Sequence, residues 1–304
     1  MNNLEKITEE TTNFKELFDL IWQEKLKVLF ITSIFSVFFV LYSLSIENTY
    51  ISQSILKVNN ETNNSLSEYS GLASMAGIDL GGGSVKNSID DLEAVLMSRN
   101  FVDHLTRFDG VILNIMAAKS FDTETQEIIL DEEEYSTSLK QWVRDVDYPF
   151  EPLPSPIEVH EVYVDKLVSI VVEDKEQFIR LSVEHVSPIF AKEFLDLMIQ
   201  ELNSIMRQRD LRDSSNALKY LKEQLADTPQ VEIRNAINDL VKNELRTQMT
   251  TKINEDYVLT KLEDPFIPLE KSNPKRSLIV ILGTILGFFF GLSFVILRNL
   301  FNGK

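Results

Sequence analysis

The chain has 304 residues, and its 30 Lys+Arg against 47 Asp+Glu give a formal net charge of -17. This excess of acidic residues argues against nucleic-acid binding, because a polyanion would be repelled. The sequence contains no cysteine, so a disulfide scaffold, a cysteine-ligated metal site and a thiol nucleophile are excluded.

Two stretches without any charged residue lie near opposite ends of the chain. They are residues 28–46 and 277–297, which are 19 and 21 residues long. At 1.5 Å per residue, each is long enough to cross a hydrocarbon core about 30 Å thick. A cleaved signal peptide is disfavoured because a 27-residue leader with six acidic residues precedes the first stretch. A buried core helix is disfavoured because aromatic residues surround all faces, so we predict two membrane spans.

Two spans place both ends of the chain on one side of the membrane. Three basic residues, Lys15, Lys25 and Lys27, flank the first span closely on its N-terminal side and one, Lys57, on its C-terminal side, and long loops cross membranes largely regardless of their charge. We therefore expect cytoplasmic segments at 1–27 and 298–304 and a periplasmic domain at 47–276. This domain holds 24 basic and 41 acidic residues (24 − 41 = −17), which disfavours tight docking of the domain on anionic lipid.

The expected periplasmic domain begins with a mixture of strand and helix patterns. Residues 50–58 alternate apolar and polar side chains and predict a strand that leaves the membrane. We interpret residues 71–83 as a small, apolar packing or subunit-contact segment, since no Gly-Lys-Ser/Thr ends it as in a phosphate-binding loop. Apolar residues at helical spacing predict a helix over 89–105, capped by Asn87 or Ser88.

The middle of the domain is acidic and rich in proline. Residues 131–134 lack the alternating ligands and the glycine of a calcium-binding loop, so we interpret them as a solvated surface run. Four prolines within 149–156 predict a stiff, extended connector. Residues 158–172 and 177–183 predict two paired strands. The side chains expected to face inward are Ile179, Leu181 and Val183.

A long helix is predicted in the second half of the domain. Ser187 and Pro188 form a good helix start, because serine caps the helix and proline fits its first turn. An apolar stripe then predicts a helix over 188–226, about 58 Å long. Pro229 is expected to end or kink this helix, and residues 231–249 resume it.

Such a long helix cannot be enclosed by one compact domain of this size. We expect it to protrude or to pack against copies of itself. Leu218 and Leu221 on its apolar stripe are candidate oligomer contacts, with a place in the core as the alternative. Residues 257–259 then predict a returning strand ahead of the second span.

The sequence offers no recognisable catalytic motif. His104, His160 and His185 lie at least 25 residues apart without a metal-binding spacing, so we interpret each as structural. With 41 acidic residues in the domain, no particular carboxylate pair is singled out for cleavage of a sugar bond. Hydrolase, nucleotide-binding, kinase and zinc-protease motifs are missing from the sequence. We expect no catalytic residue, no cofactor and no metal site.

The second predicted span has a regular glycine pattern. Gly283, Gly287 and Gly291 lie four residues apart, so they share one helix face and permit close approach of another helix. We expect this face to form an interface. The residues that lead into the span are Pro274, Lys275 and Arg276.

Several segments, in this order along the chain, are similar to one known family. These segments are residues 17–22 before the first span, 50–58, 71–78, 185–188 before the long helix, and 273–279 leading into the glycines and ending at Arg298. They resemble the Wzz-type O-antigen chain-length determinants, which are polysaccharide co-polymerases. The likeness covers both ends and residues 157–226, whereas residues 107–156 match no motif of that family.

The resemblance implies an α+β fold, in which two transmembrane helices flank a periplasmic α/β base domain with a long protruding helix. It implies a non-enzymatic regulator of lipopolysaccharide O-antigen chain length in the bacterial inner membrane, assembled as a homo-oligomer. The implied partner is the Wzy polymerase, which extends an undecaprenyl-diphosphate-linked glycan. The three glycines would then seat the second span against the first span or the polymerase, and Pro274 would fix where that span begins.

Three alternatives stay open from the sequence. The nearest is a co-polymerase for capsule, exopolysaccharide or enterobacterial common antigen, of the kind without a fused tyrosine kinase. The second is a two-span membrane sensor, which would need a cytoplasmic output domain or partner. The third is a periplasmic glycan-processing enzyme, which would convert a lipid-linked glycan by itself.

Overall fold

The structure, a computed structural model, describes residues 22–59, 85–173, 178–227, 229–253 and 256–302. The chain divides into two compact units, one formed by Met1–Asn48 with Lys271–Lys304 and the other by Thr49–Glu270. We call them the helix-pair unit and the α/β unit. Residues 71–83, interpreted above as a packing segment, lie outside the described residues.

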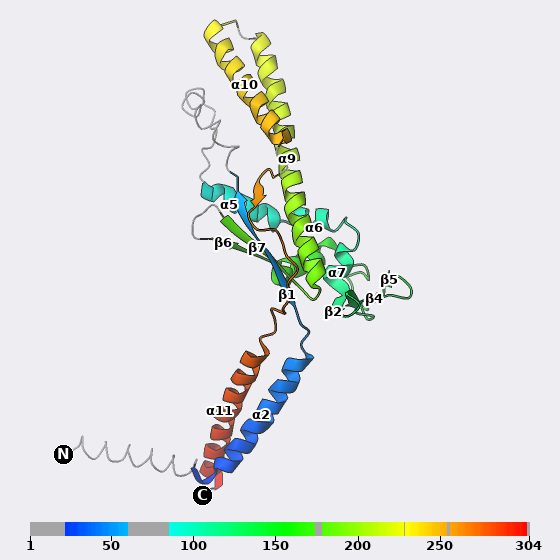
Figure 1. The fold of residues 1–304 in the computed structure, drawn as a ribbon, viewed down its shortest axis with the longest axis vertical. Helices are drawn as coiled ribbons and strands as arrows, with labels where there is room; N and C mark the ends of the chain where they lie inside the picture. Colours follow the sequence, from blue (N-terminus) through cyan, green and yellow to red (C-terminus); the bar gives the residue numbers. More distant parts are fainter. Residues whose placement is uncertain (1–21, 60–84, 174–177, 228, 254–255, 303–304) are drawn as a thin grey trace, which may run out of the picture. The chain divides into compact units, whose positions relative to one another are not determined.

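The helix-pair unit consists of α2 (Lys25–Ser45) and α11 (Arg276–Asn302), which run side by side (Figure 1). The most apolar 18 residues of α2 and of α11 have mean hydropathies of 2.2 and 2.6. Only 11% of these residues in α2 and 22% in α11 are buried. Phe30 and Phe289 illustrate this, being 66% and 60% exposed. A helix in the core of a soluble protein would bury such residues, so the pair fits a membrane-spanning hairpin.

The α/β unit is built on a four-stranded antiparallel sheet in the order β6-β7-β1-β8. The expected inward set on β7 is confirmed, because Ile179, Leu181 and Val183 are each fully buried. β1 pairs with β7 so that Ser54 lies opposite Leu181. The strands are β1 (Tyr50–Val58), β6 (Val168–Val172), β7 (Phe178–His185) and β8 (Leu259–Lys261).

One face of this sheet is covered by the first half of α9 (Pro188–Asp227). The Ser187 hydroxyl accepts a hydrogen bond from the Phe190 N–H at 3.2 Å, as expected for a helix cap. Forty residues give a helix about 60 Å long, which extends well beyond the sheet. Its second half packs against α10 (Val231–Ile253) as a helical hairpin, as Figure 1 shows.

Short helices and two small hairpins complete the α/β unit. Most of them add to one hydrophobic core with the sheet and α9, and the Tyr163 hydroxyl donates to the Leu96 carbonyl at 3.1 Å inside it. The helices are α5 (Val85–Leu96), α6 (Arg99–Leu105), α7 (Val111–Ala117), α8 (Pro156–Val162) and the π-helix η1 (Tyr163–Leu167). The hairpins pair β2 (Ala118–Asp122) with β3 (Glu127–Leu130) and β4 (Tyr135–Ser136) with β5 (Gln141–Trp142).

Two predicted elements are wrong in extent. The single helix expected over 89–105 is broken, because the Ser98 side chain accepts from the Phe101 N–H and starts a second helix, α6. The strand expected from residue 158 begins only at Val168. A reciprocal capping box between Ser155 and Glu158 starts α8 in its place, with proline in the first turn.

Candidate functional site

The three glycines of α11 lie against α2, which is one of the two surfaces expected from the sequence. A Cβ added at Gly287 would lie 2.5 Å from the Cβ of Phe35, and one at Gly283 would overlap the Phe39 side chain. At Gly291 it would lie 3.3 Å from the carbonyl oxygen of Val28. Only glycine therefore fits the first two positions without displacing an aromatic ring.

Polar and aromatic contacts accompany the glycine face. The Thr284 hydroxyl donates to the Val280 carbonyl at 2.8 Å and lies 3.3 Å from the Ser36 hydroxyl on α2. The rings of Phe35 and Phe290 lie 5.3 Å apart between centroids. These contacts hold the two helices at a specific register, with residue 283 beside 39 and residue 291 beside 28. The helices are therefore antiparallel.

The second predicted group, Pro274, Lys275 and Arg276, leads into α11, which begins at Arg276. The Pro274 carbonyl accepts the Arg276 N–H at 2.9 Å, and the Lys275 carbonyl accepts the Leu278 N–H at 3.0 Å. The Arg276 guanidinium reaches the end of α2, where it donates to Asn48 Oδ1 at 3.1 Å and lies 3.5 Å from the Ile46 carbonyl. At this end of the helix pair, Arg276 of α11 is therefore linked to the segment after α2 by hydrogen bonds to neutral oxygen atoms.

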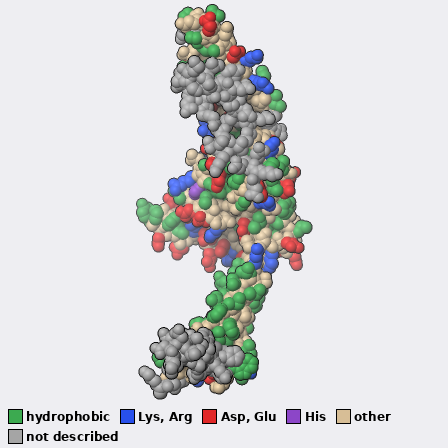
Figure 2. Space-filling model, turned by 90° about the vertical axis from the view of Figure 1, so that its left-hand side faces the viewer, with side chains coloured by type: hydrophobic (Ala, Val, Ile, Leu, Met, Phe, Trp, Pro, Cys, Tyr) green, Lys and Arg blue, Asp and Glu red, His purple; other side chains and the backbone are tan. Residues whose placement is uncertain are grey.

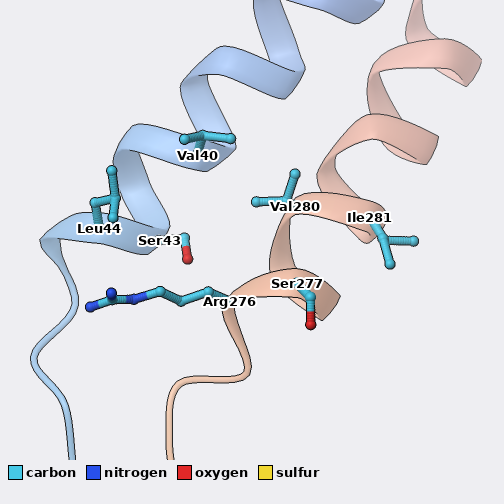
Figure 3. Close-up of a pocket in the computed structure, with 7 residues that line it drawn as sticks. All are labelled: Val40, Ser43, Leu44, Arg276, Ser277, Val280 and Ile281. Carbon is cyan, nitrogen blue, oxygen red and sulfur yellow. The ribbon is translucent and has the colours of Figure 1, made fainter.

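A hollow of about 390 Å³ lies between the two helices beside the first turn of α11. Figure 3 shows the Arg276 side chain crossing its floor, with the Ser43 hydroxyl directed toward it. Ser43 is 2% exposed, and neither its hydroxyl nor Nε of Arg276 has a hydrogen-bond partner among the described residues. The remaining lining residues are Val40, Leu44, Ser277, Val280 and Ile281.

The third predicted group, Leu218 and Leu221, lies in the part of α9 that pairs with α10. Leu218 is only 7% exposed, whereas Leu221 is half-buried. The two helices are also linked by Gln248, whose amide donates to the Ser215 hydroxyl at 3.1 Å. Burial within a single chain favours a core role for Leu218, whereas part of Leu221 stays accessible.

Each of the three histidines has a structural hydrogen bond in the α/β unit. His104 Nε2 lies 2.7 Å from a Glu201 carboxylate oxygen, and His160 Nε2 lies 2.9 Å from the Met97 carbonyl. Among the described residues, no three His, Asp or Glu side chains are grouped as a metal site would require. These contacts agree with the structural interpretation of these histidines.

His185 is the most buried of the three. Its Nδ1 accepts the Ser187 N–H at 3.0 Å, and its Nε2 lies 2.8 Å from the Asn114 carbonyl, which only a ring N–H can donate to. Burial lowers the pKa of His185, although the two backbone contacts oppose this effect. The imidazole is therefore a neutral, fixed link between β7, α7 and the start of α9.

Asn203 fastens α9 to the edge strand β8. Its Oδ1 accepts the N–H groups of Val258 and Leu259, both at 2.9 Å, and its Nδ2 donates to the Leu259 carbonyl at 2.9 Å. The side chain is 5% exposed, so all three contacts are shielded from water. Because β8 is a short edge strand, this side chain supplies partners that a further strand would otherwise supply.

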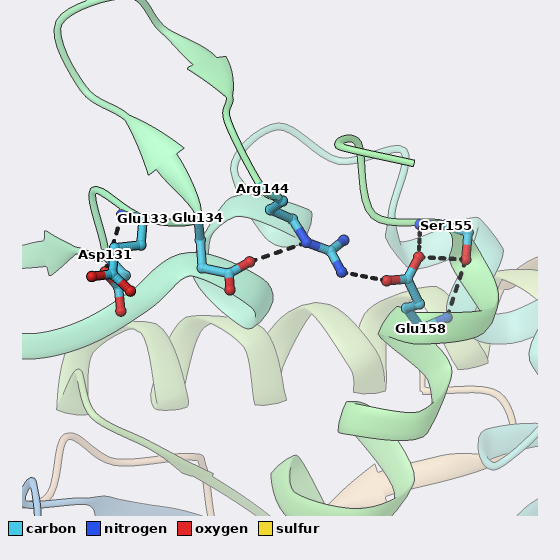
Figure 4. A network of polar contacts seen from close by, with 6 residues as sticks. All are labelled: Asp131, Glu133, Glu134, Arg144, Ser155 and Glu158. Atoms are coloured by element: carbon cyan, nitrogen blue, oxygen red, sulfur yellow. Dashed lines mark hydrogen bonds and ion pairs between the residues drawn. The ribbon is translucent and has the colours of Figure 1, made fainter. Parts of the chain in front are cut away.

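Arg144 holds the segment before α8 through two carboxylates, as Figure 4 shows. Its Nη2 lies 2.5 Å from Glu158 Oε1, and its Nε lies 3.1 Å from Glu134 Oε2. Burial favours the neutral acid, but the Ser155 N–H and the Arg144 guanidinium together hold the pKa of Glu158 below its ordinary value. Figure 4 also shows Asp131, in the acidic run, accepting the Glu133 N–H at 3.2 Å.

The surfaces of the two units differ in kind. Figure 2 shows hydrophobic side chains along the helix pair, and many acidic side chains over the α/β unit.

Sequence reasoning missed Ser43, Asn48, Asn203 and Arg144, because their roles depend on contacts between distant segments. The spacing of Phe35 and Phe39, four residues apart like the glycines, is the one signal that could have suggested their pairing.

Two antiparallel apolar helices with a glycine interface are long and apolar enough to cross a membrane, and the α/β unit carries a 40-residue helix; both features fit a two-span type of membrane protein. Residues 10–107 match the family model described as "Wzz: Chain length determinant protein". This segment of the chain is similar to the Wzz chain length determinant family, in agreement with the resemblance found in the sequence. No curated protein matches the chain.

Similar solved structures include two polysaccharide co-polymerases and an O-antigen chain-length regulator. A full-length bacterial polysaccharide co-polymerase is 13% identical, with 94% of this chain and 97% of that chain covered and a TM-score of 0.39. A fragment of WzzB from Salmonella Typhimurium is 14% identical, covering 74% of this chain and 100% of its own, with a TM-score of 0.28. A mutant of the Shigella flexneri O-antigen chain-length regulator is 11% identical, with the same coverages and a TM-score of 0.23.

Proposed function

We propose that this protein is a non-enzymatic regulator of lipopolysaccharide O-antigen chain length in the bacterial inner membrane. It acts as a homo-oligomer together with the Wzy polymerase, which extends an undecaprenyl-diphosphate-linked glycan. The observation that carries this proposal is the family match over residues 10–107, which includes the first span and β1. The helix-pair unit supports it as a hairpin that retains the protein in the membrane.

The side-chain chemistry supports a regulatory role over a catalytic one. Among the described residues, the buried titratable groups have structural partners: His185 bonds backbone atoms, Glu158 caps α8 and pairs with Arg144, and Tyr163 bonds the Leu96 carbonyl. The Glu158 carboxylate and the His185 imidazole are therefore engaged in structural contacts and are not positioned to act as a general acid or base.

Both ends of the chain are proposed to be cytoplasmic and the α/β unit periplasmic. The antiparallel pairing of α2 and α11 supports this arrangement, since it brings both outer ends of the spans to the same side. Alkaline phosphatase fused after residue 270 of a truncated chain should be active, and the same reporter fused after residue 304 should be inactive. The reverse pattern would refute the topology.

Self-assembly is proposed to use the hairpin of α9 and α10. Leu221→Asp should lower the oligomer mass of the detergent-solubilised protein while leaving its melting temperature nearly unchanged, because Leu221 is partly accessible. Leu218→Asp should lower the melting temperature, because Leu218 is buried within the chain. A protein that stays monomeric at all concentrations would refute this part of the proposal.

The decisive test is genetic. Deletion of the gene should replace a modal distribution of lipopolysaccharide bands by a random one, and restoration should recover the mode. A change confined to capsule, exopolysaccharide or enterobacterial common antigen would assign the protein to a different polymer. Loss of all polymer would indicate that the protein is needed for synthesis itself, and would refute a purely regulatory role.

A further inference from the structure

The hollow beside Arg276 contains polar hydrogen-bonding groups that the chain leaves unpaired. Ser43 is 2% exposed, and its hydroxyl has no partner among the described residues. Nε of Arg276 is also buried and without a hydrogen-bond partner within the same part of the chain. An unpaired buried donor is costly, and two of them at one hollow point to a binding partner that would pair with them.

The two groups define the chemistry of that ligand. A guanidinium N–H only donates, and a serine hydroxyl donates readily, so the ligand must offer acceptor oxygens. Arg276 contacts only the neutral oxygens of Asn48 and Ile46, and no carboxylate in the described ranges lies within ion-pair distance of it. Its positive charge is therefore uncompensated, which favours an anionic acceptor.

The surroundings add a positive field and an apolar wall. Arg276 is the first residue of α11, a helix of 27 residues, whose N-terminus attracts anions. Lys275 is exposed in the turn before it, and Lys271 donates to Asn48 Oδ1 at 3.3 Å. Glu47 is the one acidic residue in 46–48 and 271–277. The hollow is otherwise lined by Val40, Leu44, Val280 and Ile281.

We propose that this hollow binds an anionic glycerophospholipid, with its phosphodiester oxygens on Arg276 and the Ser43 hydroxyl and an acyl chain along the apolar wall. A free phosphate ion would leave the apolar wall without a partner, whereas a lipid occupies both parts at the end of a membrane span. The inference goes beyond chain-length regulation and depends only on insertion of the two helices in a membrane.

Native mass spectrometry of the full chain in detergent, titrated with phosphatidylglycerol, tests the site. Arg276→Gln should weaken binding about tenfold, the effect expected from losing a charge-assisted hydrogen bond. Arg298→Gln, an exposed arginine on the same helix, is the matched control and should leave binding unchanged. Equal binding by both variants would overturn the proposal.

A second variant keeps the test valid if Arg276→Gln does not fold. Ser43→Leu fills the hollow without altering charge, and it should also weaken phosphatidylglycerol binding while the helical circular dichroism signal is retained. Three further probes separate the sources of the phosphate group. Weaker binding of phosphatidylcholine supports the need for net negative charge. Tighter binding of a polyprenyl phosphate, or equal displacement by inorganic phosphate, would overturn the assignment to a glycerophospholipid.

Discussion

The helix-pair unit and the α/β unit are each stabilised internally, but by opposite kinds of contact. In the helix-pair unit, α2 and α11 can approach closely because glycine has no side chain: a side chain at Gly283 or Gly287 would overlap Phe39 or Phe35. In the α/β unit, distant segments are joined by added polar atoms, such as the amide of Asn203 on β8. In lipid, apolar contact alone gives little drive for helix association, so the association depends on how closely the two helix surfaces fit. In water, a polar group that folding buries must be paired, because an unpaired one is costly.

This difference predicts that enlarging a residue harms the first unit, whereas shortening a polar residue harms the second. Asn203→Ala in the α/β unit and Gly287→Leu in the helix-pair unit test these two expectations. Each has a control on the exposed side of the same helix.

The largest effect is expected at Asn203. Asn203→Ala leaves two buried N–H groups and one carbonyl of β8 without partners, which should cost about 3–5 kcal/mol of unfolding free energy. Thermal melting of the full chain in detergent measures it. Asn216→Ala, on an exposed part of α9, should change the melting temperature little. Equal effects of the two would show that polar pairing does not secure α9 to the sheet.

The next effect is expected at the glycine face. Gly287→Leu should weaken the helix pair by about 1–3 kcal/mol through overpacking against Phe35. The chain has no cysteine, so Ser36→Cys with Thr284→Cys gives a clean cross-link, since their hydroxyl oxygens lie 3.3 Å apart. Gly287→Leu should reduce the disulfide yield, and Ser293→Leu on the exposed face of α11 should not. An unchanged yield would refute the role of the glycines.

A smaller effect is expected at Glu158. Its depressed pKa means that the unfolded state binds the proton more readily, so its stabilisation is present above its ordinary value of 4.5 and is lost as the pH falls below it. Glu158→Gln should cost about 1 kcal/mol at pH 7 and reduce the loss of stability in acid. Urea unfolding at pH 7 and pH 4 checks this, and an unaltered acid response would contradict it.

The smallest effect is expected at His185. Burial lowers its folded pKa, so the unfolded state takes up the proton first, and the contribution of His185 declines as the pH falls below its ordinary value of 6.5. Melting temperatures between pH 8 and pH 5 should show this decline. His185→Gln does not titrate in this range and should flatten it. A slope that is unchanged in the variant would assign the decline to other groups.

The sequence was most informative where one local pattern decides the structure. Alternation in β7 and the Ser187-Pro188 start of α9 were interpreted correctly, because burial of one face and a single cap determine them. The strand expected over 158–167 was wrong, although Ser155, Pro156 and Glu158 carry the same kind of helix start as Ser187 and Pro188. That signal was present and overlooked.

Other features could not be predicted from the sequence. The pairing of Gly283 with Phe39, of Asn203 with β8, and of Arg144 with Glu158 each join segments far apart in the chain or on different elements. Such contacts depend on the register of packed elements, which local propensity does not specify. The hollow at Ser43 belongs to this class as well, since it exists only between two helices.

The proposed role, regulation of chain length without catalysis, is tested most directly by reconstitution. Purified polymerase and lipid-linked repeat units in liposomes should make chains of random length, and adding this protein should concentrate them around one length. The protein added without the polymerase should leave the repeat units unchanged. Polymer or cleavage products formed by this protein alone, or a length distribution that does not respond to it, would contradict the account.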